Sequence, residues 1–140
     1  MTDSPIFITG MYRSGTTLLS RILNAHKDLS ITYDSLHYMR YIYKKYGNNR
    51  ILKKNIDNVL DLVIQRIKNR TGKLLIKNNI KKKLLKKKVI KYNFFYQLIM
   101  KDFLIEKSGS RHWGEKTNIA WKEIPNFFDM FSKGKVIFMI

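Results

Sequence analysis

Residues 5–19 read PIFITGMYRSGTTLL, and three kinds of pattern follow one another in this segment. Residues 5–9 are a β-branched and aromatic run, which is typical of a buried strand. Residues 10–17, GMYRSGTT, hold two glycines in the spacing Gly-x4-Gly. From Gly15 onward a helical stripe appears, formed by Leu18, Leu19, Ile22 and Leu23. The segment therefore predicts a strand, a glycine-containing loop and a helix, in that order.

The loop matches the frame of the nucleotide phosphate-binding loop, G-x-x-x-x-G-K-[ST], except at one position. Its glycines let the backbone turn tightly, so that successive N–H groups and the helix N-terminus form an anion cradle. Thr16 stands where the motif has Lys, and Arg13 brings the positive charge three residues earlier. Loss of that Lys disfavours triphosphate chemistry, whereas a planar Arg suits a diester-like group such as a phosphosulfate. We predict a functional anion-binding loop in preference to a turn without a ligand.

Two further strands are expected outside this segment. Residues 29–34, LSITYD, alternate like a short strand, and residues 135–140, KVIFMI, read as a buried strand. Strand, loop, helix and strand begin an α/β domain with a parallel sheet. Ligands of such sheets bind beyond the carboxyl ends of the strands. Because the chain stops at the last strand, we expect it to be truncated after an internal strand, as the first part of a longer protein.

The middle of the chain, about residues 50–107, is basic and helical. Apolar residues keep a helix period over 52–67 and again over 84–104, and Thr71-Gly72 separates the two stretches. No acidic residue occurs between positions 62 and 101, where thirteen are Lys or Arg. Residues 66–91 have three interpretations: a solvated helical face, a platform for an anionic substrate, or a nucleic-acid surface. Nucleic acid is the least expected, because the aromatic residues at 92–96 fit helix packing better than base stacking.

The last third holds a loop at residues 108–110, the segment HWGEKT and a helix that tolerates Pro125 in its first turn. Trp113 and Trp121 are predicted core residues. Glu115 is expected to pair with a cation or to cap a turn. His26, His37 and His112 are given structural roles. For His37 two interpretations stay open, either an acceptor pocket shared with nearby tyrosines or aromatic helix packing.

Composition excludes several classes of protein. The 140 residues, 44% of them hydrophobic, suffice for one domain with one core. The absence of Cys excludes disulfides, thiolate zinc sites and cysteine nucleophiles. No signal peptide or membrane-length apolar run is present and no metal-ligand spacing stands out, so we expect a cytoplasmic protein without a metal. The formal net charge of +18 favours an anionic partner, although codon bias toward Lys, Ile and Asn also raises it.

Residues 10–19, GMYRSGTTLL, resemble the 5′-phosphosulfate-binding loop of the sulfotransferases, closer to the bacterial and protein-tyrosine type than to the cytosolic type. Residues 22–28, ILNAHKD, resemble the helix and turn that follow it, with Lys27 in place of a Pro. The resemblance covers the first forty residues well and 113–140 moderately. It implies a three-layer α/β fold of the P-loop nucleoside-triphosphate-hydrolase type. Residues 1–140 would form the N-terminal part of a single domain with a basic helical insertion.

The resemblance also implies the donor 3′-phosphoadenosine 5′-phosphosulfate and a hydroxyl-bearing acceptor, a glycan or a peptide among others. Arg13 matches the basic residue that contacts the bridging oxygen and the sulfonate. The cradle for the 5′-phosphate would be formed by Ser14, Gly15, Thr16 and Thr17. The family's loop after the strand at 136–140, which helps to hold the 3′-phosphate, has no counterpart in this chain.

Two catalytic candidates come from outside the loop. Asp34 falls, by spacing, where protein-tyrosine sulfotransferases carry a Glu that acts as general base. Its alternative role is to cap a helix that begins at Ser35. Lys116, within GEKT at 114–117, resembles a Lys that places a second cation near the transferring group.

The sequence thus predicts a sulfotransferase. Two alternatives remain, a P-loop nucleotide or small-molecule kinase and a non-enzymatic polyanion or nucleic-acid binder. Thr16 argues against the kinase. A polyanion binder would not depend on Arg13.

Overall fold

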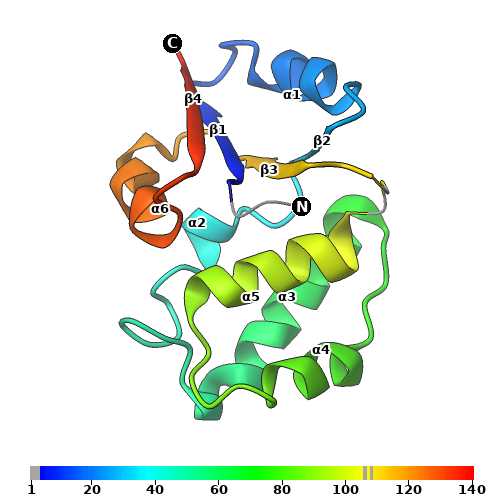
Figure 1. Ribbon diagram of the computed structural model, residues 1–140, viewed down its shortest axis with the longest axis vertical. Helices are drawn as coiled ribbons and strands as arrows, with labels where there is room; N and C mark the ends of the chain where they lie inside the picture. The colour runs from blue at the N-terminus through cyan, green and yellow to red at the C-terminus, as the bar shows by residue number, and fades with distance from the viewer. Residues whose placement is uncertain (1–3, 106, 108) are drawn as a thin grey trace.

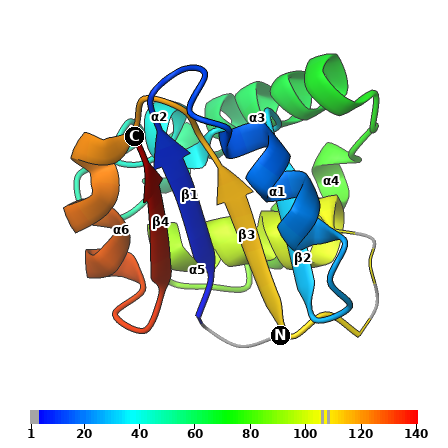
Figure 2. The same ribbon diagram turned by 90° about the horizontal axis from the view of Figure 1, so that it is seen from above.

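The structure is a computed structural model, and it describes residues 4–105, 107 and 109–140 (Figure 1). Its described strands are β1 (Ile6–Gly10), β2 (Leu29–Tyr33), β3 (His112–Lys116) and β4 (Lys135–Met139). They form one sheet in the order β2-β3-β1-β4, and every pairing is parallel. Figure 2 shows the arrows of β1, β3 and β4 side by side with the same direction. The predicted parallel α/β sheet is therefore confirmed.

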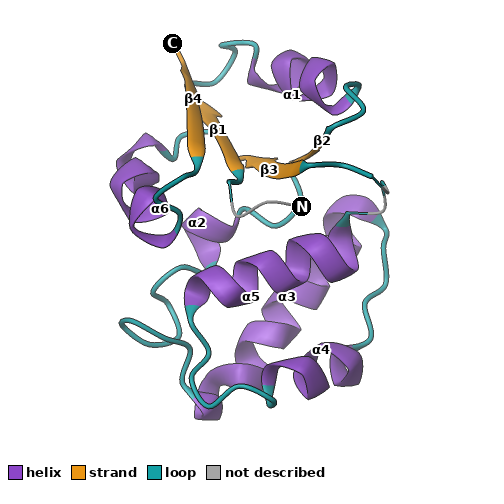
Figure 3. Ribbon diagram, in the orientation of Figure 1, coloured by secondary structure: helices purple, strands orange, loops and turns teal. Residues whose placement is uncertain are grey.

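Helices cover both faces of this sheet. On one face lies α1 (Thr16–Asn24), whose Leu19 and Leu23 pack against a small cluster of strand isoleucines. The other face carries the helices of the basic insertion together with α2 (Tyr38–Tyr41) and α6 (Ile124–Met130). Figure 3 shows this second helical layer on the side of the sheet away from α1. The layers are helix, sheet and helix, as the three-layer fold requires.

The insertion folds as a packed helical unit. It contains α3 (Ile56–Thr71), α4 (Lys77–Leu84), α5 (Tyr92–Leu98) and a wider helical turn over Ile99–Leu104. Short 3-10 turns precede α3 at Lys53–Asn55 and α6 at Trp121–Glu123. The apolar stripe of α3 is buried, and Tyr38 stacks on Tyr96 with ring centroids 3.9 Å apart. One continuous core therefore joins the insertion to the sheet.

The single helical stretch predicted over 84–104 is wrong. The chain leaves the helix at Leu84 and resumes it only at Tyr92, and the intervening Leu85 and Val89 are exposed. A continuous helix there is unfavourable because Lys82 would face Lys86 and Lys83 would face Lys87, four positions apart, and such like-charge pairs are destabilising. Ile90 is instead buried through an antiparallel bridge to Ile51.

The sheet also differs from the prediction at two strands. β3 was not predicted as a strand, because HWGEK lacks β-branched residues, although it occupies the position between β2 and β1. A Cβ on Gly114 would lie 2.5 Å from the carbonyl oxygen of Ile6, so this strand needs a glycine to approach β1. The predicted burial of the last strand is also wrong: β4 is an edge strand of the described sheet, and Phe138 is 47% exposed.

Of the two tryptophans predicted for the core, one is buried. Trp113 is fully buried against Tyr96 and Phe131. The prediction for Trp121 is wrong, because it lies half-buried in a 3-10 turn and packs against Phe138 of the edge strand. Ser108, in the predicted loop at 108–110, lies outside the described residues.

Most charges of the basic insertion lie at the surface. Lys77 and Lys81 of α4 form ion pairs with Asp61 and Asp57 of α3, and Lys83 pairs with Asp102. The lysines at 82 and 86–88 are exposed. None of the helices in the described residues is long and apolar enough to cross a membrane.

Candidate functional site

The loop between β1 and α1 is fitted closely to the edge strand. A Cβ on Gly10 would lie 2.3 Å from the carbonyl oxygen of Met139, and that oxygen accepts a hydrogen bond from the N–H of Met11. A clash with backbone cannot be relieved by a side-chain rotation. The position at the end of β1 therefore requires glycine in this sheet.

The loop then turns into the helix through two left-handed residues, Arg13 at φ 61° and Gly15 at φ 86°. The hydroxyl of Ser14 donates a hydrogen bond to the carbonyl of Met11, which tightens the turn. Gly15 is the N-cap of α1, and no acidic residue occupies the helix's first turn. The positive end of the helix dipole therefore faces the loop without a neutralising carboxylate of its own. The Arg13 side chain is exposed.

The segment after β3 lies along this loop. The N–H of Thr117 donates to the carbonyl of Ile8, and the N–H of Ile119 donates to the carbonyl of Gly10. The hydroxyl of Thr16 donates to Oδ1 of Asn118 at 2.8 Å. Asn118 was not singled out from the sequence, since an Asn beyond an unrecognised strand carries no signal of its own.

A second polar group lies where β2 ends. Lys116, only 1% exposed, donates from Nζ to Oδ1 of Asp34 at 3.2 Å, and His37 Nε2 lies 3.4 Å from the same oxygen. Burial tends to raise the pKa of Asp34, but the interactions of the carboxylate with Lys116 and then with His37 together outweigh it, so the pKa is below its usual value. The structure therefore brings Asp34 and Lys116 together with the carboxylate ionised at neutral pH.

His37 is a neutral neighbour of this pair. Burial and the nearby charge of Arg66 lower its pKa to about 4, although the Asp34 carboxylate acts in the opposite direction. Its ring stacks on Tyr41, and the guanidinium of Arg66 lies 3.9 Å from the centroid of that tyrosine ring. Of the two interpretations of His37, the aromatic packing is present in its stack on Tyr41, while Tyr33 lines a cavity that is described below.

Glu115 holds the turn that carries Asp34 and His37. Its carboxylate accepts hydrogen bonds from the N–H groups of His37 and Tyr38 and from the hydroxyl of Tyr96, at 2.9, 3.0 and 2.6 Å. The prediction that Glu115 caps a turn is confirmed. Burial raises the pKa of this fully enclosed carboxyl, and the three donors oppose the increase.

This arrangement removes the capping role considered for Asp34. The next helix, α2, begins only at Tyr38, and Glu115 accepts the hydrogen bonds from its first N–H groups. Asp34 itself has a left-handed backbone at φ 52° and directs its carboxylate to Lys116. Capping of a helix from Ser35 by Asp34 is therefore wrong, and the carboxylate pairs with Lys116 and lies next to His37 instead.

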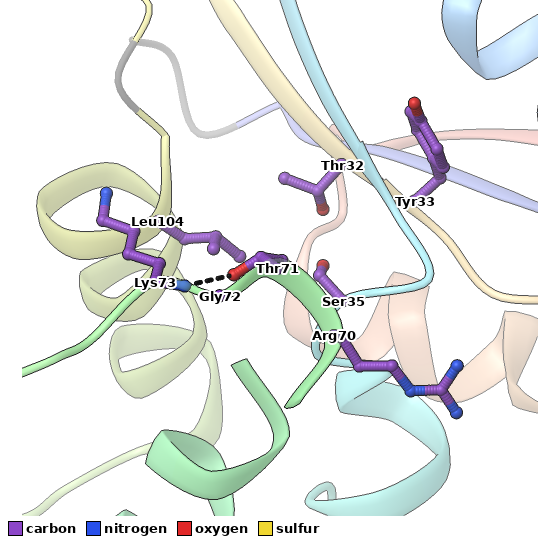
Figure 4. Close-up of a pocket in the computed structure, with 8 residues that line it drawn as sticks. All are labelled: Thr32, Tyr33, Ser35, Arg70, Thr71, Gly72, Lys73 and Leu104. Carbon is purple, nitrogen blue, oxygen red and sulfur yellow. Dashed lines mark hydrogen bonds between the residues drawn. The ribbon is translucent and has the colours of Figure 1, made fainter. Parts of the chain in front are cut away.

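A cavity of about 600 Å³ opens beside the same turn (Figure 4). Its walls come from the end of β2, the carboxyl end of α3 with the residues that follow, and the wide helical turn. The lining residues are Thr32, Tyr33, Ser35, Arg70, Thr71, Gly72, Lys73 and Leu104. Tyr33 and Ser35 flank Asp34 in the chain, so the cavity is next to the Asp34 backbone.

The sequence-predicted site residues thus form two groups. Residues 13–17 form the loop around the start of α1, and Asp34 forms an ion pair with Lys116. Lys116 joins the two groups through the sheet, because it is in register with Tyr33 of β2 on one side and with Ile8 of β1 on the other. Within the described residues, no group of three or more His, Asp or Glu is arranged to hold a metal ion.

Comparison with known proteins gives one match and one negative result. A family model described as "Sulfotransferase family" matches residues 5–140, which is nearly the whole chain. No curated protein matches the sequence significantly. The matched region includes the β1–α1 loop, the Asp34–Lys116 pair and the whole basic insertion.

Proposed function

This chain belongs to the sulfotransferase family, and we propose that it transfers a sulfuryl group from 3′-phosphoadenosine 5′-phosphosulfate to a hydroxyl-bearing acceptor. The observation that carries the proposal is the β1–α1 loop. It combines a glycine that admits no Cβ, a left-handed Gly15 and the uncapped positive end of a nine-residue helix. Such a loop suits a phosphate group, which accepts hydrogen bonds from backbone N–H groups.

The residues present fit the 5′-phosphosulfate end of this donor. Ser14, Thr16 and Thr17 bring hydroxyl groups to the amino end of α1, and Arg13 brings an exposed guanidinium to the loop. In this proposal the backbone N–H groups of the loop and the hydroxyl of Thr17 hold the 5′-phosphate, and Arg13 contacts the bridging oxygen and the sulfonate. Ser14 and Thr16 would join them by exchanging their present hydrogen bonds to Met11 and Asn118 for bonds to the phosphate. A planar guanidinium is well suited to two oxygens of one such group.

The reaction forms a bond from the acceptor oxygen to sulfur and breaks the bond between sulfur and the bridging oxygen. That oxygen keeps the bonding electrons as adenosine 3′,5′-bisphosphate leaves. The acceptor hydroxyl becomes acidic as its oxygen bonds to sulfur, and Asp34, held ionised by Lys116, accepts the proton. The buried ammonium of Lys116 stabilises the negative charge that develops on the transferring group.

The donor assignment is tested by binding of adenosine 3′,5′-bisphosphate to the purified protein, measured by calorimetry. We expect Arg13→Ala to weaken this binding at least about tenfold, because it removes charge-assisted hydrogen bonds to the phosphate side. Arg50→Ala is the matched control, since Arg50 is also exposed but lies in a loop of the basic insertion. Its affinity should equal that of the wild type.

The result that contradicts the proposal is equally specific. Bisphosphate binding that is unaffected by Arg13→Ala, or lost to the same extent in Arg50→Ala, would indicate a general polyanion binder. Binding of ATP that requires Mg²⁺ would favour the kinase alternative.

A further inference from the structure

The lysine loop is the connection between α4 and α5, residues 85–91, which read LKKKVIK. Its three consecutive lysines, Lys86 to Lys88, are exposed. The aliphatic side chains on either side of them are accessible as well, since Leu85 is 49% exposed and Val89 is 43% exposed. A single exposed aliphatic residue is common on a protein surface. Two of them around three lysines make a surface that is both cationic and apolar.

The lysine loop lies at one end of the molecule. Figure 1 shows it, together with the amino end of α3, at the end away from α1 and the carboxyl terminus. An antiparallel bridge joins the two segments, and in it the N–H of Ile51 donates to the carbonyl of Ile90 at 2.8 Å. Lys53 and Lys54 are exposed in the turn that follows Ile51. The fold therefore brings basic side chains from two segments of the chain to the same end.

Carboxylates do not neutralise the lysines of this loop. The described acidic side chains of the insertion pair instead with lysines of α4, namely Asp57 with Lys77 and Lys81, Asp61 with Lys77, and Asp102 with Lys83. No ion pair between described residues includes Lys86, Lys87 or Lys88. The ammonium of Lys87 lies 5.0 Å from the centroid of the Phe94 ring. An anionic partner would reduce the repulsion among the three lysines.

The surface of an anionic lipid bilayer suits both properties of the lysine loop. Lipid phosphates attract clustered lysines, and the boundary between headgroups and acyl chains accepts aliphatic side chains. A nucleic acid would contact the lysines but would leave Leu85 and Val89 in water. The ring of Phe94 has the ammonium of Lys87 over it, so this ring is not free for base stacking.

We propose that the lysine loop docks on the surface of a bilayer that contains anionic lipids. Lys86, Lys87 and Lys88 contact the headgroup phosphates, and Leu85 and Val89 enter the boundary beneath them. The β1–α1 loop lies at the other end of the molecule and stays open to solvent (Figure 1). The inference goes beyond the proposed function and does not depend on it.

The test is cosedimentation of the purified protein with lipid vesicles in the absence of nucleotide. One set of vesicles is pure phosphatidylcholine, and the other contains about one third phosphatidylglycerol, an anionic lipid. We expect binding to the anionic vesicles to be at least about tenfold tighter than binding to the neutral ones. This preference should decline as the salt concentration rises from about 0.1 M to about 1 M, because salt screens the attraction.

The variant K86Q/K87Q/K88Q tests the charge of the loop. It should bind the anionic vesicles about a hundredfold more weakly than the wild type, because three cationic contacts with the headgroups are lost. The side chains are exposed and have no ion pair with described residues, so the thermal midpoint of the variant should not fall.

The matched control is K122Q/K133Q/K135Q. It removes the same amount of charge from three exposed lysines near α6 and β4, in the half of the molecule that holds the sheet. Its binding to the anionic vesicles should equal that of the wild type. Equal loss in the two triple variants would show that net charge alone attracts the protein, and would overturn the assignment to the lysine loop.

The variant L85Q/V89Q tests the apolar contact. It should bind the anionic vesicles at least about tenfold more weakly, because the aliphatic side chains no longer leave water, and should bind duplex DNA like the wild type. Its control is L18Q/I22Q, since these residues of α1 are 64% and 60% exposed at the other end of the molecule. That control should bind the vesicles like the wild type.

Other outcomes also overturn the proposal. These are no binding to the anionic vesicles, equal binding to neutral and anionic vesicles, and wild-type binding by either K86Q/K87Q/K88Q or L85Q/V89Q. Duplex DNA that binds more tightly than the vesicles, and whose binding is lost in K86Q/K87Q/K88Q, would assign the lysine loop to a nucleic acid instead. Because no nucleotide is present, failure here leaves the Arg13 test of the donor site unaffected.

Discussion

The strand-containing half of the molecule and the basic helical insertion bury different kinds of side chain. Glu115, Lys116, His37 and several hydroxyl residues are buried in or beside the sheet. Between residues 50 and 105, by contrast, every buried residue that the structure describes is hydrophobic or a tyrosine. Burial of a polar or charged group is costly unless partners compensate it. The buried charged groups that the structure describes therefore lie in the sheet half, and the insertion keeps its charges at or near the surface.

The insertion nevertheless supports the edge of the sheet that carries the candidate site. The hydroxyl of Tyr96 donates to Glu115, and Nε of Arg66 donates to the carbonyl of Leu36 at 2.9 Å. Both contacts hold the turn between β2 and α2. Arg70 extends the same helical face into the cavity. The insertion is therefore part of the site's framework, although its lysines remain at the surface.

The difference between the two halves is tested most strongly by substituting one matched carboxylate in each half. Asp34 and Asp102 are about equally exposed, 49% and 41%, and each pairs with one lysine, Lys116 and Lys83. We expect Asp34→Asn to lower kcat for sulfuryl transfer about a thousandfold, because it removes the proton acceptor. Transfer is measured with a radiolabelled donor and a hydroxyl acceptor that the wild type modifies.

Asp102→Asn is the control for that experiment. It removes an exposed ion pair of the insertion, and such pairs contribute little. Its kcat should equal that of the wild type. Equal loss in both variants, or wild-type kcat in Asp34→Asn, would mean that the sheet half has no special catalytic carboxylate.

A second comparison uses two glycines. Gly10→Ala would force a Cβ against backbone of β4, and we expect a loss of about 3 kcal/mol in the free energy of unfolding. Gly72, which ends α3 at φ 75°, has open space around its Cβ position. Gly72→Ala should therefore cost only the left-handed backbone, about 1 kcal/mol. Urea unfolding measures both, and equal losses would show that the loop is not packed as described.

The parts of the fold that could be predicted are those with a local signal. Residues 10–17 predicted the loop because glycine spacing, a preceding apolar run and a following helical stripe agree within one short segment. β3 could not be found this way, because its residue types are set by contacts with distant segments. Trp113 and Glu115 are buried in the interior, and Gly114 leaves room for the carbonyl oxygen of Ile6. Asn118 and the cavity depend on segments that are distant in the chain, so no local pattern marks them.

The smallest expected effect concerns the contact between the two halves. In this contact the carboxylate of Glu115 accepts hydrogen bonds from α2 and α5. Burial raises the pKa of Glu115 above the usual value of 4.5, and hydrogen bonds from Tyr96, Tyr38 and His37 offset part of that increase. A raised pKa means that the folded state holds the proton more tightly than the unfolded state. The carboxyl's contribution to stability is then complete below pH 4.5 and declines as the pH rises through the folded-state pKa.

Glu115→Gln isolates this decline, because both proteins share every other titrating group. The amide cannot accept hydrogen bonds through its nitrogen, so the variant loses stability at every pH. The electrostatics are tested by the dependence on pH alone. The wild type should lose its advantage over the variant gradually as the pH rises above 4.5, because the pKa of Glu115 is raised. Urea unfolding at several pH values measures it. An advantage that grows with pH would mean that the donors of the helical half outweigh burial, and that the two halves together stabilise an ionised carboxylate.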